Sequence, residues 1–272
     1  MSLRSWFSLA YRKERGAWAA QACVVSVCLA MLLGGPCAWG QKELRVAAAA
    51  DLQPVMPVLS QAYEHATGVK LVVSFGSSST LATQILDGAP MDIFLAADFT
   101  YPEKIVAGGL ADGTAPVAYA KGTLVLWARK DSGLLPLSIE TLIDPRVKTV
   151  AIANELHAPY GRAAAAALRK MKMYDTVAPH LVVGENIAQT AQFVESGNAQ
   201  LGLISLTAAS TDHFKEIGTY VLVPTSQYPE ILQYAVVMKN SDRRADAHAF
   251  LDWLLTPAVQ ANWSKLGLGA VK

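Results

Sequence analysis

Ser77, Ser78, Ser79 and Thr80 form a run of hydroxyl side chains between two apolar patterns. The apolar residues 69–73 before the run are typical of a buried strand, and those of 81–86 after it have helical spacing. This order places side-chain hydroxyls and unpaired backbone N–H groups at a helix N-terminus. The run therefore predicts a site for an anion, although the same residues could serve only as a helix cap.

A second strand followed by a helix start lies earlier in the chain. Residues 44–49 predict a strand, and apolar residues spaced three and four apart over 52–63 predict a helix with Asp51 as its N-cap. If the two strands are parallel neighbours, both helix starts lie at the carboxyl edge of one sheet, where open α/β sheets bind ligands. We therefore expect Ala50 and Asp51 to lie near Ser77 and Ser78.

Strands and helices alternate through the rest of the chain, which favours parallel sheets covered by helices. Further strands are predicted at 91–98, 123–127, 150–153, 181–183, 201–205, 221–223 and 235–238, and helices at 102–107, 139–144, 162–171 and 187–195. The two series predict two lobes, one of residues 43–122 with 236–272 and one of residues 123–235. The chain is expected to cross between them near Gly122–Thr123 and near Tyr234–Ala235.

Residues 1–40 have the pattern of a secretory signal peptide. Basic residues precede an apolar run over 17–33, and Ala38-Trp39-Gly40 follows, which predicts cleavage near Gly40. Two alternatives remain open. A membrane anchor is disfavoured because Gly34-Gly35-Pro36 breaks the run, and lipid attachment at Cys37 is disfavoured because no aliphatic residue precedes it at the expected place.

Cysteine and charge content exclude several classes of function. All three cysteines precede residue 41, so the exported chain lacks a disulfide framework, a thiol nucleophile and a thiolate metal site. Without the four basic residues and one acidic residue of the first 40, 19 basic and 21 acidic residues remain, a net charge of −2. No basic stripe is present, so nucleic acid and anionic membranes are poor candidates for partners.

Five segments resemble, in the same order, the periplasmic molybdate-binding proteins. They are residues 46–52, 75–82, 88–94, 158–161 and 201–203. The resemblance covers nearly all of the chain after residue 40, and its most specific parts are the Gly-Ser-Ser-Ser run at 76–79 and the Gly-Ala-Pro-Met-Asp run at 88–92. It implies a type II periplasmic binding protein, with two α/β lobes, each a mostly parallel sheet flanked by helices, and two crossing hinge strands.

The same resemblance implies the function. Such a protein is periplasmic and is not an enzyme. It captures molybdate or tungstate between its lobes and delivers the oxyanion to the membrane permease of an ABC importer. The resemblance also implies a monomer that needs no cofactor.

The residues implied for the ligand are neutral hydrogen-bond donors, with no direct metal-ion ligand. Ser78 would donate its hydroxyl, Tyr160 its phenol or a backbone N–H, and Ile187 its backbone N–H. Two positions depart from the family, because Asp51 replaces a Ser or Asn and Ser205 replaces a Tyr that some members use. The complete predicted site is Ala50, Asp51, Ser77, Ser78, Tyr160, Ile187 and Ser205.

The carboxylate of Asp51 poses a problem for such a ligand. A unit-charge pair at about 4 Å costs on the order of 4 kcal/mol at an effective dielectric near 20. We expect the carboxylate to turn away from the site and cap its own helix, accepting from the N–H of Gln53. The alternative is that it accepts a proton from a protonated oxyanion such as phosphate.

Two other functions remain as alternatives. A binding protein of the same type could take sulfate or phosphate in place of molybdate. A hydrolase is disfavoured, because the sequence has no Gly-x-Ser-x-Gly elbow and no Ser-x-x-Lys pair to activate a serine.

Overall fold

The computed structural model describes residues 42–271. The predicted signal peptide, its cleavage near Gly40, and the alternatives of an anchor and of a lipid at Cys37 all lie outside the described residues. Within residues 42–271, no helix has both the length and the apolar character needed to cross a bilayer.

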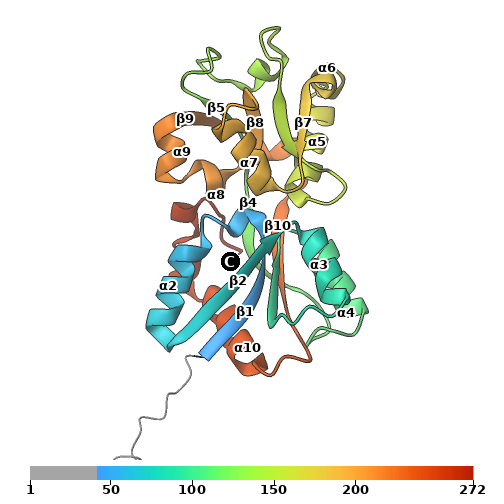
Figure 1. The fold of residues 1–272 in the computed structure, drawn as a ribbon, viewed down its shortest axis with the longest axis vertical. Helices are drawn as coiled ribbons and strands as arrows, with labels where there is room; N and C mark the ends of the chain where they lie inside the picture. Colours follow the sequence, from blue (N-terminus) through green and yellow to red (C-terminus); the bar gives the residue numbers. More distant parts are fainter. Residues whose placement is uncertain (1–41, 272) are drawn as a thin grey trace, which may run out of the picture. The chain divides into compact units, whose positions relative to one another are not determined.

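The first sheet has the strand order β2-β1-β3-β10-β4 (Figure 1). Its strands are β1 (Lys42–Ala49), β2 (Val69–Gly76), β3 (Ile93–Ala96), β4 (Val117–Gly122) and β10 (Ile231–Val237). β1 is parallel to β2 and β3, whereas β10 is antiparallel to β3 and β4. Ala49 pairs with Gly76, which confirms that the segments after β1 and β2 leave the sheet side by side at one edge.

The second sheet repeats this pattern with the order β7-β6-β8-β5-β9. Its strands are β5 (Leu124–Arg129), β6 (Val150–Ala153), β7 (Leu181–Gly184), β8 (Leu201–Ser205) and β9 (Gly218–Leu222). β6 is parallel to β7 and β8, and β5 is antiparallel to β8 and β9. Each sheet is therefore mixed, and the α/β fold of two sheets flanked by helices that the sequence predicted is confirmed.

Helices cover both faces of both sheets (Figure 1). On the first sheet, α2 (Met56–Thr67) and α10 (Arg244–Leu254) pack on one face, and α3 (Ser78–Leu86) and α4 (Thr100–Ala107) on the other. On the second sheet, α5 (Pro159–Lys170) and α6 (Tyr174–Val177) oppose α7 (Ile187–Glu195), α8 (Leu206–Ala209) and α9 (Asp212–Ile217). The short elements are α11 (Pro257–Gln260) and the 3₁₀ turns η1 (Ala50–Leu52), η2 (Ile139–Ile143), η3 (Ala178–His180), η4 (Thr225–Gln227) and η5 (Trp263–Leu266).

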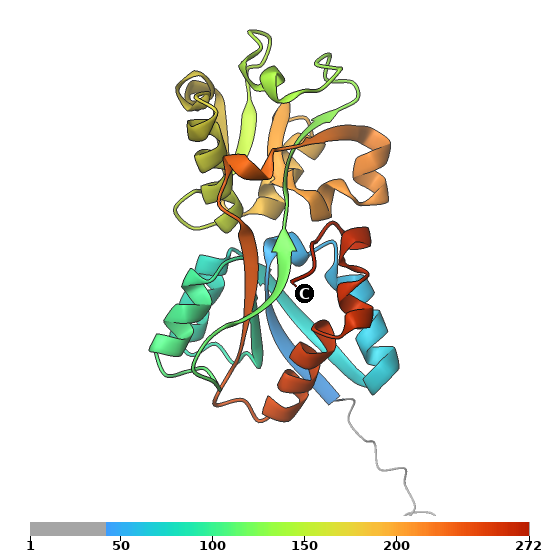
Figure 2. The ribbon, with the colours of Figure 1, turned by 180° about the vertical axis from the view of Figure 1, so that it is seen from behind.

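Two segments connect the sheets (Figure 2). Thr123 alone separates β4 from β5, and residues 223–230 lead from β9 to β10. Tyr234 and Ala235, where the sequence placed the second crossing, lie inside β10 and pair with β3 and β4. The polar side chain of Gln233 interrupts the apolar run, so the sequence pattern started this strand too late.

The helix predicted over 52–63 is broken into η1 and α2. Pro54 and Pro57 cannot donate backbone hydrogen bonds, and Pro57 lies in the first turn of α2, where no such donor is needed. Asp51 lies inside η1, whose N-cap is Ala49, and the N–H of Gln53 bonds the carbonyl of Ala50 at 3.2 Å. The prediction that Asp51 caps its own helix is therefore wrong.

Candidate functional site

Asp51 is a buried acid that contacts elements of both sheets, with only 1% of its surface exposed. Its Oδ2 accepts hydrogen bonds from the hydroxyl of Tyr160 on α5, at 3.1 Å, and from the side-chain amide of Gln233 on β10. The hydroxyl of Tyr119 on β4 donates to Oε1 of Gln233 at 2.8 Å. This last bond fixes the amide of Gln233 so that its NH₂ group faces Asp51.

The other oxygen of this carboxyl, Oδ1, is buried and has no hydrogen-bond partner among the described residues. Burial raises the pKa of Asp51 to about 7, against the lowering effect of the hydrogen bonds from Gln233 and Tyr160. None of the groups that shift this pKa is a cation. The carboxyl is therefore expected to exchange its proton close to neutral pH.

The backbone of Asp51 is held from the second sheet. The hydroxyl of Thr207 lies 2.7 Å from the carbonyl oxygen of Asp51 and 2.8 Å from Oγ of Ser205. Ser205 ends β8 and caps α8, accepting from the N–H of Ala208 at 3.4 Å. Ser205 thus reaches η1 through Thr207, which the sequence reasoning did not single out.

The serines of the hydroxyl run have different contacts. Ser77 is the N-cap of α3; its Oγ accepts from the N–H of Thr80 at 3.1 Å and lies 2.7 Å from that residue's hydroxyl. Ser78 is the first residue of α3, and its Oγ accepts from the N–H of Ala97 at 3.0 Å. Because that bond uses Ser78 Oγ only as an acceptor, its own proton remains able to bond an anion. The capping interpretation therefore describes the contacts of Ser77 but not those of Ser78.

Tyr160 reaches Asp51 because two glycines leave room for it. A Cβ on Gly161 would lie 2.4 Å from the carbonyl oxygen of Ala153, so glycine lets α5 begin close against the end of β6. A Cβ on Gly122, the last residue of β4, would lie 2.3 Å from the hydroxyl of Tyr160. The single phenolic proton is donated to Asp51, so in this structure Tyr160 acts on the site through that carboxyl.

Ile187 is the first residue of α7, and its side chain is buried. Oδ1 of Asn186 caps the helix by accepting from the N–H groups of Ala188 and Gln189, both at 3.0 Å. At the first position of the helix, the N–H of Ile187 has no acceptor within the helix. The predicted backbone donor is therefore positioned by an asparagine cap, which the sequence analysis did not single out.

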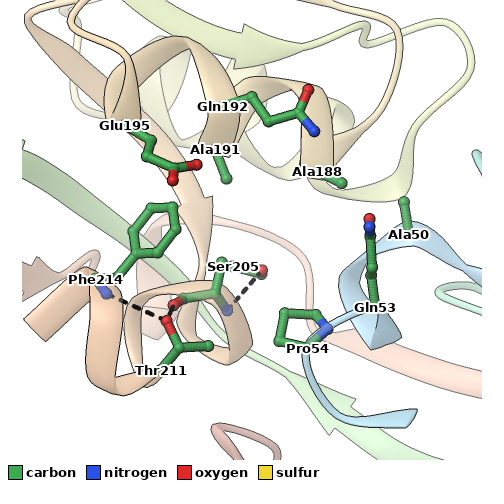
Figure 3. Close-up of a pocket in the computed structure, with 11 residues that line it drawn as sticks. Ala50, Gln53, Pro54, Ala188, Ala191, Gln192, Glu195, Ser205, Thr211 and Phe214 are labelled. Carbon is green, nitrogen blue, oxygen red and sulfur yellow. Dashed lines mark hydrogen bonds between the residues drawn. The ribbon is translucent and has the colours of Figure 1, made fainter. Parts of the chain in front are cut away.

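A hollow of about 200 Å³ lies between η1 and the helices of the second sheet (Figure 3). Ala50, Gln53 and Pro54 line one side, and Ala188, Ala191 and Gln192 of α7 line the other. Glu195, Ser205, Ala208, Thr211 and Phe214 complete its wall. Solvent can approach the η1 segment from this side.

The structure brings most of the predicted residues together. Asp51 contacts Tyr160 directly and Ser205 through Thr207, and Ala50 shares the hollow with Ser205. Ala97, the partner of Ser78, packs in one apolar cluster with Ala50, Tyr160 and Ile187. Among the described residues, the side chain of Ser77 forms hydrogen bonds only within its own helix start.

Gln233 and Tyr119 are the site residues that the sequence analysis missed. Both lie on strands of the first sheet, β10 and β4, and both are fully buried. The available signal was a polar side chain inside an apolar strand pattern, which costs free energy unless the group is paired. β4 itself was not predicted, so Tyr119 had no assigned position.

Arg162, near the start of α5, is ion-paired. Its guanidinium contacts the carboxylate of Asp98, after β3, and lies 5.6 Å from the ring centre of Tyr101. The hydroxyl of Tyr101 donates to the carbonyl of Leu156 at 3.3 Å. These contacts link the first sheet to the second, and the charge of Arg162 is directed to Asp98, not to Asp51.

Asp92, the acid of the Gly-Ala-Pro-Met-Asp run, has a structural role. Its Oδ1 lies 2.7 Å from Nη2 of Arg45, and its Oδ2 accepts from the backbone N–H of Arg45 at 2.7 Å. Ser241 also donates to Oδ1, at 2.7 Å. Burial alone would raise the pKa of Asp92, but these hydrogen bonds hold it below its ordinary value.

The two halves of the fold bring buried neutral donors together at Asp51, an acid that has no cation partner among the described residues. This arrangement is that of a binding protein. Residues 44–269 match the family of bacterial extracellular solute-binding proteins. The chain is 37% identical over 233 residues to the molybdate-binding protein ModA of Azotobacter vinelandii, covering 86% of this chain and 92% of that one. It is 34% identical over 240 residues to ModA of Rhodobacter capsulatus, covering 87% of this chain and 91% of that one.

A solved structure gives the same result. The periplasmic molybdate-binding protein of Azotobacter vinelandii superimposes with a TM-score of 0.79 and 30% identity, covering 84% of this chain and all of that one. The chain therefore belongs to the family of bacterial extracellular solute-binding proteins. It is a solute-binding protein and not an enzyme.

Proposed function

We propose that this protein captures molybdate and delivers it to the membrane permease of an ABC importer. The proposal is carried by the two relatives named as molybdate-binding proteins, which match this chain over 86% and 87% of its length. The site supports it, because a tetrahedral dianion needs several donors from different directions, and both sheets supply them at the ends of their parallel strands.

In the proposed site, the ligand is held by hydrogen bonds to its oxygens and not by ligands to the metal. Ser78 would donate its free hydroxyl proton, and Ile187 its N–H at the start of α7. Ala50 and Ser205 would line the cavity, Ser77 would fix the start of α3, and Tyr160 would hold Asp51. The donors are neutral, so binding would not require a counter-charge.

We propose that the two sheets form the two lobes, with the hinge at Thr123 and at residues 223–230. The ion pair of Arg162 with Asp98 and the hydrogen bond of Tyr160 to Asp51 join the two sheets. A ligand that contacts both lobes would favour this closed arrangement, because it interacts more strongly with the closed state. The mature protein would act as a periplasmic monomer after signal cleavage.

Isothermal calorimetry with molybdate, tungstate, sulfate and phosphate tests this function. We expect molybdate and tungstate to bind at least a hundredfold more tightly than sulfate and phosphate. If sulfate or phosphate bound as tightly as molybdate or more tightly, molybdate would be the wrong ligand, but the protein would still be a solute-binding protein.

Ser78→Ala provides the matched variant for that titration. Loss of a charge-assisted hydrogen bond costs about 1.5–3 kcal/mol, so molybdate affinity should fall by about one to two decades. Ser77→Ala, which removes only a cap, should lower the melting temperature with a smaller effect on affinity. If both variants bind molybdate as the wild type does, the ligand lies elsewhere.

A further inference from the structure

The two oxygens of the Asp51 carboxyl have different surroundings. Oδ2 accepts from both Tyr160 and Gln233, and the hydrogen bond from Tyr119 to Oε1 of Gln233 favours the amide orientation in which the NH₂ group faces Oδ2. A proton on Oδ2 would oppose two donors that are already directed at it. When this carboxyl is neutral, its proton therefore belongs on Oδ1, the oxygen that has no partner.

We propose that Asp51 binds the oxyanion as a neutral carboxylic acid, donating the hydrogen of Oδ1 to a ligand oxygen, so that molybdate binding takes up one proton. The inference rests on the proposed function and extends it to ligand selection. A dianion offers only acceptors and would be repelled by a carboxylate at hydrogen-bond distance. A carboxylic acid satisfies both the ligand and its own buried oxygen.

Among the residues that the structure describes, none beside Asp51 supplies a positive charge to balance a second negative one. The titratable groups that face it are the phenols of Tyr160 on α5 and Tyr119 on β4, both of which stay neutral because burial raises their pKa values well above 10. β10 contributes the amide of Gln233, and α8 contributes the hydroxyl of Thr207. On α7, Glu195 lines the outer hollow and is paired with His213 at 2.9 Å.

The proton balance separates two kinds of oxyanion. Above pH 7, the free protein carries the carboxylate, and molybdate carries no proton, so one proton must enter from solvent with the ligand. Hydrogen phosphate brings its own proton and could share it with Oδ1 without any uptake. The pKa of Asp51, raised by burial to about 7, places this difference within an accessible pH range.

Calorimetry with sodium molybdate tests the inference. Titrations at pH 8 in two buffers of different ionisation heat count the protons taken up per ligand bound. We expect a value near one for the wild-type protein, and a Kd that is constant below about pH 6 and rises towards tenfold per pH unit above pH 7 to 8.

Asp51→Asn is the decisive variant. Its amide can accept from Tyr160 and Gln233 on the oxygen and present a permanent N–H where the Oδ1 proton would lie. It should bind molybdate with no proton uptake and with a Kd that does not change between pH 6 and 9. His213→Gln, which removes the partner of Glu195 beside the outer hollow, should keep the proton uptake of the wild type. Thermal melts by circular dichroism check that each variant is folded.

The outcomes are distinct. Molybdate binding by the wild type at pH 8 without proton uptake overturns the inference and leaves the proposed function standing, whether or not the Asn variant folds. Proton uptake that persists in Asp51→Asn also overturns it. If the wild type binds no molybdate between pH 5.5 and 9, the proposed function fails and the inference fails with it.

Discussion

Asp51 and Asp92 are both buried aspartates of the first sheet, and they lie at opposite ends of its parallel strands. Asp92 precedes β3, whereas Asp51 follows β1. Asp92 has its charge balanced by Arg45 and both oxygens bonded, and its pKa is lowered. Within residues 42–271, Asp51 has no cation beside it and one of its oxygens has no hydrogen-bond partner, and its pKa is raised. The comparison teaches that burial alone does not single out a candidate site, whereas a buried acid without a balancing charge does.

Replacing Asp92, the acid whose charge is balanced, should have the largest effect on stability. Asp92→Ala leaves the N–H of Arg45 and the hydroxyl of Ser241 without their acceptor. It also breaks the ion pair with Arg45, in which the Asp92 side chain is buried. We expect the free energy of unfolding to fall by about 3–5 kcal/mol. Chemical denaturation measures this loss, and molybdate affinity at a temperature where the variant is folded should stay close to that of the wild type. A strong loss of affinity in the folded variant would contradict the assigned structural role.

Removing the unbalanced charge should stabilise the ligand-free protein at high pH. The folded pKa of Asp51 is raised to about 7 from an ordinary value of 3.8. The free energy of unfolding of the wild type is therefore highest below pH 4, where Asp51 is protonated in both states, and falls as the pH rises to about 7. Each pKa unit is worth about 1.4 kcal/mol. Asp51→Asn should therefore gain stability relative to the wild type between pH 4 and 8, by up to about 4 kcal/mol. Urea denaturation at a series of pH values measures the difference, and a constant difference would contradict it.

Asp92 should give the opposite pH dependence. Its folded pKa is lowered, so its contribution is present above pH 4 and is lost as the pH falls through its folded pKa. Between pH 2 and 6, the free energy of unfolding of the wild type should exceed that of Asp92→Asn by an amount that shrinks as the solution becomes more acidic. A difference that grows on acidification would remove the contrast between the two acids.

Tyr160→Phe asks how the second sheet controls Asp51. The variant loses a hydrogen bond that stabilises the charged carboxylate of the free protein more than the neutral acid that binds molybdate, so molybdate affinity above pH 7 should rise, by up to about tenfold. The bond from Tyr160 also lowers the pKa of Asp51, so the midpoint of the pH dependence should move to higher pH. A merely structural role would lower affinity without moving that midpoint. Calorimetry across pH 6–9 distinguishes the two results.

The smallest effect is expected at Arg162. Its side chain is 40% exposed, and ion pairs of this kind contribute about 0–1 kcal/mol. Arg162→Gln should weaken molybdate binding by no more than about fivefold, through loss of a contact between the sheets, with no change in proton uptake. A hundredfold loss would mean that Arg162 supplies charge to the ligand. Titration at low and high salt checks that the small effect is electrostatic.

Local sequence patterns determined much of this protein. Alternating strands and helices predicted both series of βα units, and the order of Val69–Gly76 and Ser77 predicted a helix start at the carboxyl edge of the first sheet. These features depend on neighbours in sequence, since side-chain periodicity and capping act over a few residues. The resemblance added the family and the turn that carries Tyr160.

The partners of Asp51 were decided only by the tertiary structure. Tyr160 and Gln233 are 109 and 182 residues away from it in sequence, and Tyr119 acts through Gln233. Local rules favoured a helix cap for Asp51, but Pro54 and Pro57 divided that helix and left the carboxyl inside η1. Burial then fixed its protonation, because the pKa of a carboxyl depends on the solvent, charges and donors that the whole fold places around it.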